Sequence, residues 1–526
     1  MHPDQEPPAR HRTDQGTTPS PDPYLSQLQI RLRRYTLRAT PLRLLCLATL
    51  LAASASALPQ SAIPRPDGTS IPTAQVDATV NQLLQAAHVT GAGIAIFHNR
   101  RIVYLKAYGL RDTEHNLPLT PDSVMTSASL SKATFAVLVM SLVRDKVLDL
   151  DKPISQYLPK PLPEYSRYTD LQGDPRWQKL TLRILLSHTS GFPNWRAFED
   201  DHKLHIHFDP GTRYAYSGEG IDLAQLVVET VTSRSLTDLM QDRIFTPLHM
   251  TRTNMVWQPA FDSNYANGYD EYGRSLGPEK RAYPDAAGSM QTTLRDYATF
   301  LSSLLHSEPL GIPATGLLFN RQIAIHSAHQ FPSLTEETST ASDAIGLSYG
   351  LGWGLYLSPH GKAFFKEGHD EGWRHLALCL REHGDGILIL TNSSNGEGIF
   401  KPLIDALLGP TLFPFDWENY TPYDRLPPLP KLKEHKPVTL TETQLSRLAG
   451  KYALSDEVGL TVTVENGHLF LQENGQPKQE YLPAGPNDFY STASSDECTF
   501  NPAGPDPAQM LVIHLEGRDL ELKRIP

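Results

Sequence analysis

Apolar segments typical of β-strands lie at both ends of one long region of the chain, and helical segments lie between them. Gly93–Phe97 and Ile102–Leu110 are separated by a short polar turn, which predicts a β-hairpin. Much later in the chain, Leu376–Leu380 and Gly386–Thr391 have the same strand character. Between these ends, Ser129–Val143 repeats apolar residues at helical spacing. We therefore expect an α/β sandwich whose sheet is built from both ends of the region.

The remaining pattern divides the chain into four parts. Further helices are predicted at Val76–His88, Thr181–Ser187, Ile221–Ser233, Leu294–Leu305 and Ile399–Leu408, and a further strand at Tyr349–Leu357. Near the C-terminus, Asn466-Gly467 between two apolar runs predicts a hairpin in a small β-domain. The expected parts are an N-terminal basic segment with a signal peptide (1–59), a main domain (60–425), a Pro- and Lys-rich linker (426–440) and a small C-terminal β-domain (441–526).

The N-terminus has the order of a secretory signal peptide. Several arginines precede the apolar run Leu44–Ala53, and small-x-small cleavage sites follow it. The run is too short to span a membrane, so no stable membrane span is expected beyond an uncleaved N-terminal anchor, which is the alternative interpretation. The chain is therefore expected to be exported, and so periplasmic or secreted.

The composition excludes several classes of protein. Hydrophobic residues make up 40% of the 526 residues, which is enough for a large core and excludes global disorder. The net charge of -11 gives no basic surface for a nucleic acid partner. Of the three cysteines, Cys46 lies in the segment expected to be removed, and Cys379 and Cys498 are expected to be free thiols.

Ser129-Leu130-Ser131-Lys132 is the S-x-x-K sequence in the chain, at the start of a predicted helix. Residues three apart on a helix share one face, so the Lys132 amine can lie beside the Ser129 hydroxyl. A serine hydroxyl becomes a good nucleophile when a neighbouring base takes its proton. The backbone N–H of Ser129 is left unsatisfied by the helix and can bind an oxyanion.

Five segments together carry a resemblance to a known family. The chain resembles class C β-lactamase-like serine hydrolases, which include penicillin-binding proteins, D-alanyl-D-alanine carboxypeptidases, D-aminopeptidases and esterases. The matching segments, in order, are Thr126–Lys132, Leu185–Pro193, Pro210–Gly218, Ala287–Asp296 and Tyr349–Gly354. The resemblance covers about residues 75–410 and implies that 60–425 is a β-lactamase/transpeptidase-like serine hydrolase domain. Its implied fold is an antiparallel sheet flanked by helices with an all-helical subdomain, followed by the small β-domain.

The resemblance also implies roles for single residues. Tyr216 takes the place of the family's proton-shuttling tyrosine, and two nearby ammonium groups are expected to lower its pKa. Lys366 would support Tyr216 and attract a substrate carboxylate. Gly368 would let the substrate approach the strand, with Glu367 beside it in the substrate-binding set, and the backbone N–H of His369 would be the second oxyanion donor.

Two positions depart from the family pattern. Gly218 stands where the family has an asparagine that helps to hold the substrate amide, and Glu367 stands where a hydroxyl is usual. Both departures put efficient β-lactam hydrolysis in doubt.

Other candidate sites compete with this assignment. Ser348 lies in a G-x-S-x-G sequence, but a strand-like run follows it where a nucleophile elbow needs a helix. Tyr265 lies in a literal Y-x-N sequence, but after the position expected for the base. The histidines His202, His205 and His207 match no metal template, and we expect them to be a surface cluster.

The sequence thus predicts a serine hydrolase with the catalytic residues Ser129, Lys132, Tyr216 and Lys366. It would act through an acyl-enzyme on a small-molecule or peptide substrate with an ester or amide carbonyl, with no metal and no cofactor. An esterase or a D-amino-acid peptidase is favoured over an efficient β-lactamase. The alternative is a weakly catalytic penicillin-binding or ligand-sensing protein that is acylated without turnover.

Overall fold

The computed structural model describes residues 62–426, 428, 435, 436 and 438–526, the last range with gaps at 455–458, 474–477, 492–495, 502–505 and 516–517. The basic segment and signal peptide predicted at 1–59 and most of the predicted linker lie outside the described residues.

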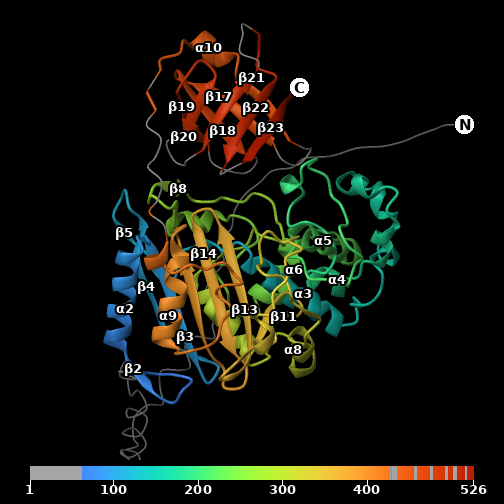
Figure 1. The fold of residues 1–526 in the computed structure, drawn as a ribbon, viewed down its shortest axis with the longest axis vertical. Coiled ribbons are helices and arrows are strands. Elements are labelled where there is room, and N and C mark those ends of the chain that lie inside the picture. The colour runs from blue at the N-terminus through green and yellow to red at the C-terminus, as the bar shows by residue number, and fades with distance from the viewer. Residues whose placement is uncertain are drawn as a thin grey trace, which may run out of the picture. The chain divides into compact units, whose positions relative to one another are not determined.

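A nine-stranded antiparallel sheet forms the centre of the larger domain (Figure 1), in the order β10-β11-β12-β13-β14-β15-β3-β4-β5. Its strands are β3 (Gly91–His98), β4 (Arg101–Asp112), β5 (Leu117–Pro118), β10 (Ile323–Ala324), β11 (Ser348–Tyr349), β12 (Gly354–Ser358), β13 (Gly361–Asp370), β14 (Trp373–Leu380) and β15 (Asp385–Thr391). β15 pairs with β3, so strands from the two ends of the domain meet in one sheet, as the sequence predicted.

Helices cover both faces of this sheet, because successive side chains of a buried strand point to opposite faces. In β3, Ile94 and Ile96 share a core with α2 (Thr73–Ala86) and α9 (Phe400–Leu407), which lie side by side in Figure 1. Ala95 of the same strand packs instead into the core of the other face. The helices of that second core are α3 (Leu130–Arg144), α4 (Leu182–Leu186), α5 (Gly218–Thr232), α6 (Leu236–Met240), α7 (Leu294–Leu305) and α8 (Ile312–Leu318).

One predicted element differs from the structure. The strand expected at Tyr349–Leu357 is two strands, β11 and β12, joined by a tight turn. Gly352 in that turn has a φ of 81°, and a Cβ atom there would lie 2.5 Å from the Ala136 side chain. The glycine-rich run therefore bends the chain closely around α3, which alternation of apolar residues alone does not reveal.

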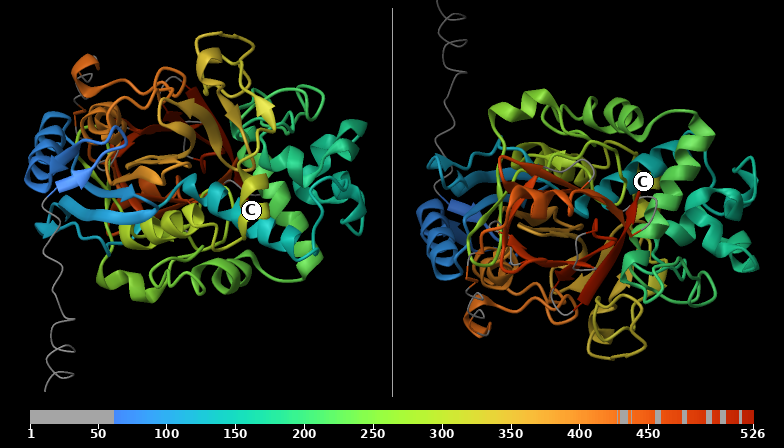
Figure 2. Two further views of the ribbon diagram at one scale, coloured as in Figure 1. Left: turned by 90° about the horizontal axis from the view of Figure 1, so that it is seen from below. Right: turned by 90° about the horizontal axis from the view of Figure 1, so that it is seen from above.

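The C-terminal domain is a closed eight-stranded antiparallel barrel, seen as a ring of strands in Figure 2. Its strands are β16 (Gly450–Ala453), β17 (Gly459–Glu465), β18 (His468–Glu473), β19 (Gln479–Pro483), β20 (Asp488–Ser491), β21 (Glu497–Asn501), β22 (Met510–Leu515) and β23 (Arg518–Ile525), and α10 (Glu442–Ser446) precedes them. The predicted hairpin is β17–β18, with positive φ at both Asn466 and Gly467. The predicted small β-domain is thus confirmed, and closure removes its free edges.

Two further expectations concern single features. Cys379 and Cys498 are free and buried, as expected, whereas Cys46 lies outside the described residues. None of the helices that the structure describes is long and apolar enough to cross a membrane.

Candidate active site

Ser129 lies at the N-cap of α3, the central helix of the second core. Ala128 before it has a φ of 46°, a left-handed conformation that costs a non-glycine residue on the order of 1 kcal/mol or more. A neighbouring segment stabilises this turn, because Ser127 Oγ donates a hydrogen bond of 2.7 Å to the Met290 carbonyl oxygen. The surrounding chain thus holds Ser129 in a strained turn whose backbone N–H has no acceptor within the helix.

Lys132 lies one helical turn after Ser129 and points back to it. Its Nζ atom is 3.0 Å from Ser129 Oγ and donates a hydrogen bond of 2.6 Å to the Ala287 carbonyl oxygen. The residue is 1% exposed. Burial, together with the positive charge of Lys366, lowers the pKa of Lys132 to about 8. A substantial fraction of this amine is therefore neutral near pH 8 and able to take the proton of Ser129.

Tyr216 is positioned by the start of α5. Ser217 caps that helix, and its backbone N–H donates to His188 Nδ1 at 3.2 Å. The His188 ring packs on the Tyr216 ring, with centroids 4.3 Å apart. Burial, and then the negative charge of Glu367, raise the pKa of Tyr216 well above its ordinary value. The expectation of a lowered pKa is therefore wrong, because two ammonium groups do not outweigh the loss of solvation.

Lys366 and Glu367 form a buried ion pair on β13. The Lys366 side chain is 0% exposed and that of Glu367 is 4% exposed. Lys366 Nζ donates to Tyr216 OH at 3.0 Å, so the structure joins this lysine to the predicted tyrosine. Glu367 also accepts a hydrogen bond of 3.3 Å from Gln330 Nε2. In the Glu367 carboxylate, which the sequence placed in the substrate-binding set, Oε1 is thus occupied by protein partners, and Oε2 is buried without a hydrogen-bond partner among the described residues.

The far half of β13 passes close to the start of α3. β12 pairs with β13 only as far as Phe365, which leaves the following edge of β13 beside the site. A Cβ atom at Gly368 would lie 2.7 Å from the Ser127 carbonyl oxygen, so only glycine fits this approach. His369, whose backbone N–H is the predicted second oxyanion donor, is the next residue of β13.

Trp195 is a residue that sequence reasoning missed. A Cβ atom at Gly218 would lie 2.4 Å from the Trp195 ring, so the indole fills the space where the family has its asparagine. Lys132 Nζ lies 5.5 Å from the centroid of the same ring, within the range of a cation–π interaction. The half-buried Trp195 ring, called the aromatic wall below, thus lies beside Lys132 in place of an amide side chain. The sequence held one indication of this contact: Gly218 stands at the asparagine position of the Y-x-N motif, and Trp195 precedes it in the chain.

The competing sequence candidates are placed elsewhere. Ser348 lies in β11 and is followed by a turn and a second strand, not by the helix of a nucleophile elbow. The Tyr265 ring packs against Trp257, with centroids 5.7 Å apart. His205 and His207 pair with Asp201 and Glu199 at 2.9 and 2.8 Å. Among the described residues, no group of three or more His, Cys, Asp or Glu side chains is arranged to hold a metal ion.

The arrangement agrees with the comparison to known families. The sequence model of the family described as Beta-lactamase matches residues 76–408. The chain belongs to the β-lactamase family. This family region includes the whole nine-stranded sheet and all of the residues brought together around Ser129.

Relatives of this β-lactamase-family chain are distant. Penicillin-binding protein 4* of Bacillus subtilis (strain 168) is 25% identical over 478 residues, which cover 85% of this chain and 97% of that protein. Protein flp of Staphylococcus aureus (strain NCTC 8325 / PS 47) is 22% identical over 346 residues, 60% of this chain and 62% of that protein.

Two solved structures share the fold. The octameric penicillin-binding protein homologue from Pyrococcus abyssi matches with a TM-score of 0.53 at 19% identity. The match covers 86% of this chain and 100% of that protein chain. The D-alanine carboxypeptidase AmpC from Burkholderia cenocepacia has a TM-score of 0.51 at 18% identity and covers 64% of this chain and 99% of that one.

In this β-lactamase-family chain, His375 forms hydrogen bonds that hold the segment before Ser129 against the sheet. It lies on β14 and is completely buried. Its Nδ1 atom accepts a hydrogen bond of 3.2 Å from the Thr391 backbone, and Nε2 lies 2.7 Å from the Thr126 carbonyl oxygen. Because Nδ1 accepts, Nε2 carries the hydrogen and donates it to Thr126. The imidazole is therefore neutral and ties β14 to the segment before Ser129.

This burial predicts loss of stability in acid. Burial lowers the pKa of His375 from 6.5 to about 4, so between these values the unfolded chain binds a proton that the folded chain does not. The free energy of unfolding should therefore fall as the pH falls below 6.5, by on the order of 2 kcal/mol between pH 7 and pH 5 from this residue alone. Urea unfolding followed by tryptophan fluorescence measures this free energy in the β-lactamase-family domain, because all six tryptophans lie between Trp177 and Trp417.

The matched variants are His375→Gln and, at an exposed position, His306→Gln. His375→Gln should weaken the pH dependence, and His306→Gln should keep it. An equal loss of stability between pH 7 and pH 5 in wild type and His375→Gln would contradict the neutral, buried state of His375.

Proposed function

We propose that this chain is a serine hydrolase that forms an acyl-enzyme on Ser129 with an ester or amide substrate. The observation that carries the proposal is the Lys132 Nζ atom 3.0 Å from Ser129 Oγ, on a buried amine whose pKa is lowered to about 8. Such an amine can act as a general base near neutral pH, whereas an ordinary lysine is almost fully protonated there.

The steps follow from this geometry. Ser129 Oγ attacks the substrate carbonyl carbon while its proton passes to Lys132. The backbone N–H groups of Ser129 and His369 stabilise the oxyanion of the tetrahedral intermediate. Collapse of the intermediate breaks the bond to the leaving alcohol or amine, which takes a proton from the Lys132–Tyr216 pair. Water then attacks the acyl-enzyme and gives a proton to the neutral Lys132. Lys132 passes this proton to Ser129 Oγ as the bond between Oγ and the acyl carbon breaks, which releases the acid and restores the enzyme.

In this mechanism Tyr216 works mainly as a protonated phenol. Its pKa is raised, so it donates a proton or a hydrogen bond to the leaving group, and Lys132 is the resting base. Lys366 orients the phenol through the hydrogen bond of 3.0 Å to its oxygen atom.

We favour esters and D-amino-acid peptides as substrates over β-lactams. The amide-holding asparagine is replaced by Gly218, and the Trp195 ring occupies its space. Purified protein should therefore turn over p-nitrophenyl butyrate faster than a chromogenic cephalosporin. Faster turnover of the cephalosporin would contradict this preference, and stable acylation without turnover of any substrate would favour a penicillin-binding or ligand-sensing role.

The pH dependence of ester hydrolysis tests the base directly. The reactive form of Lys132 is the neutral amine, so kcat/KM for a neutral ester should rise with pH through an apparent pKa of about 8 and level off above it. Initial rates from pH 6 to pH 10 at constant ionic strength measure the profile. A profile that stays flat from pH 6 to pH 9 would exclude Lys132 as the base.

A further inference from the structure

Lys366 has no hydrogen-bond donor left for a substrate. An ammonium group offers three N–H donors. Those of Lys366 meet Tyr216 OH at 3.0 Å, the Glu367 carbonyl oxygen at 3.1 Å and the Glu367 carboxylate. The charge of Lys366 is also balanced by the carboxylate of Glu367, and both members of this ion pair are buried away from water. The cation expected to attract a substrate carboxylate is therefore already paired with a carboxylate of the protein.

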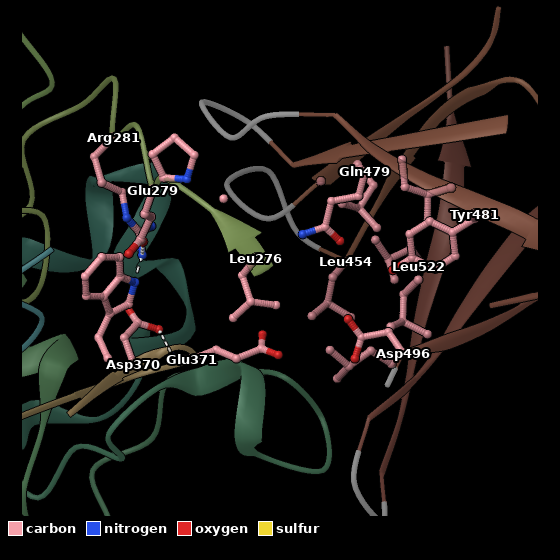
Figure 3. A pocket seen from close by; sticks show the side chains of 18 residues that line it. Leu276, Glu279, Arg281, Asp370, Glu371, Leu454, Gln479, Tyr481, Asp496 and Leu522 are labelled. Carbon is pink, nitrogen blue, oxygen red and sulfur yellow. Dashed lines mark hydrogen bonds and ion pairs between the residues drawn. The ribbon is translucent and has the colours of Figure 1, made fainter. Parts of the chain in front are cut away.

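Other cations near the end of β13 are paired as well. Figure 3 shows Arg281 next to Glu279 and Asp370, and Arg281 forms ion pairs with both, at 3.5 Å to Asp370. Arg374, which faces His369 across the β13–β14 ladder, lies 3.2 Å from Glu397 Oε2. Each of these positive charges is thus balanced by an acidic side chain.

We infer that this site selects substrates that carry no carboxylate next to the scissile bond, and that Glu367 sets this specificity through Lys366. The inference rests on the proposed function and narrows its substrate class to neutral esters and amides. A substrate carboxylate would lose its hydration, meet the negative charge of Glu367 and find the ammonium donors used. An uncharged substrate incurs none of these costs.

The aromatic wall favours the same class of substrate. Trp195 stands beside Lys132 where an amide side chain would otherwise hydrogen-bond a peptide-like substrate. An indole ring offers apolar surface and one N–H donor, with no acceptor. The side of the site next to Gly218 is therefore suited to an apolar acyl chain.

A matched pair of esters tests the inference. Phenyl butyrate bearing a carboxylate at position 3 of the leaving phenol is compared with its methyl ester, which is neutral. Each kcat/KM is divided by the rate constant of alkaline hydrolysis, to correct for leaving-group reactivity. Wild-type enzyme should prefer the neutral ester by at least about tenfold, as expected for an unpaired charge brought next to Glu367.

Replacing Glu367 should reverse this discrimination. Glu367→Gln removes the negative charge, and Glu367→Thr also frees an ammonium donor of Lys366. Either variant should move the ratio of the two kcat/KM values at least about tenfold toward the carboxylate ester, mostly through KM. A general disturbance of the site would change both esters alike and leave the ratio unchanged.

Glu418→Gln is the matched control. Glu418 is a buried glutamate near the pair, and burial raises its pKa well above the ordinary value. Its replacement should leave the ratio at the wild-type value.

Two results would overturn the inference alone: a wild-type preference for the carboxylate ester, which needs no variant to be seen, or a ratio in a folded Glu367 variant within twofold of wild type. If wild-type enzyme hydrolyses neither ester, the proposed function fails, and this inference fails with it.

Discussion

Replacing Ser129 with alanine is expected to lower kcat for ester hydrolysis by at least about 10⁴-fold, the size of loss typical when a serine nucleophile is removed. The variant keeps the oxyanion donors and Lys132 but has no atom on which the acyl group can form a bond. Fold and stability should change little, because the alanine still fits the turn at the start of α3. Initial rates with p-nitrophenyl butyrate, at enzyme concentrations high enough to detect residual turnover, measure the loss.

Ser348→Ala is the control for this loss. Ser348 is the serine of the competing G-x-S-x-G sequence and is buried in β11. Turnover in Ser348→Ala should stay within severalfold of wild type. The opposite pattern, with activity kept in Ser129→Ala and lost in Ser348→Ala, would show that Ser348 and not Ser129 is the nucleophile.

Replacing Lys132 with arginine is expected to lower kcat/KM by roughly 10² to 10⁴-fold, the usual contribution of a general base. Arginine keeps a positive charge next to Tyr216 but cannot be deprotonated, so it cannot accept the proton of Ser129. The remaining activity should also lose the rise with pH near 8. Lys401→Arg, an exposed lysine paired with Asp405, should leave both quantities unchanged. Full activity in Lys132→Arg would show that the base is another group.

Much of the fold could be predicted because local patterns determine it. The apolar periodicity around Ser129 predicts a helix, and α3 is buried along almost its whole length. Asn466-Gly467 predicts the β17–β18 hairpin because both residues tolerate positive φ. The bend between β11 and β12 could not be predicted in this way, because it depends on the contact between Gly352 and Ala136, which are far apart in sequence.

The residues of the site were within reach of motif reasoning, but their electrostatics were not. The S-x-x-K spacing placed Lys132 beside Ser129, and the structure gives 3.0 Å between Nζ and Oγ. The direction of the Tyr216 pKa shift depends on burial and on the place of the Glu367 charge, and neither is visible in a linear motif. Glu367 looked like a simple replacement of a hydroxyl, and only the structure pairs it with Lys366.

The central claim is that Ser129 forms a covalent acyl-enzyme with help from Lys132. Intact-mass analysis after treatment with a fluorophosphonate probe tests it most directly, because the probe reacts with an activated serine whatever the natural substrate is. We predict a single adduct in wild-type protein, located by peptide mapping on Ser129, formed much more slowly in Lys132→Arg and absent in Ser129→Ala. No adduct in folded wild-type protein, or an adduct that persists in Ser129→Ala, would contradict the account.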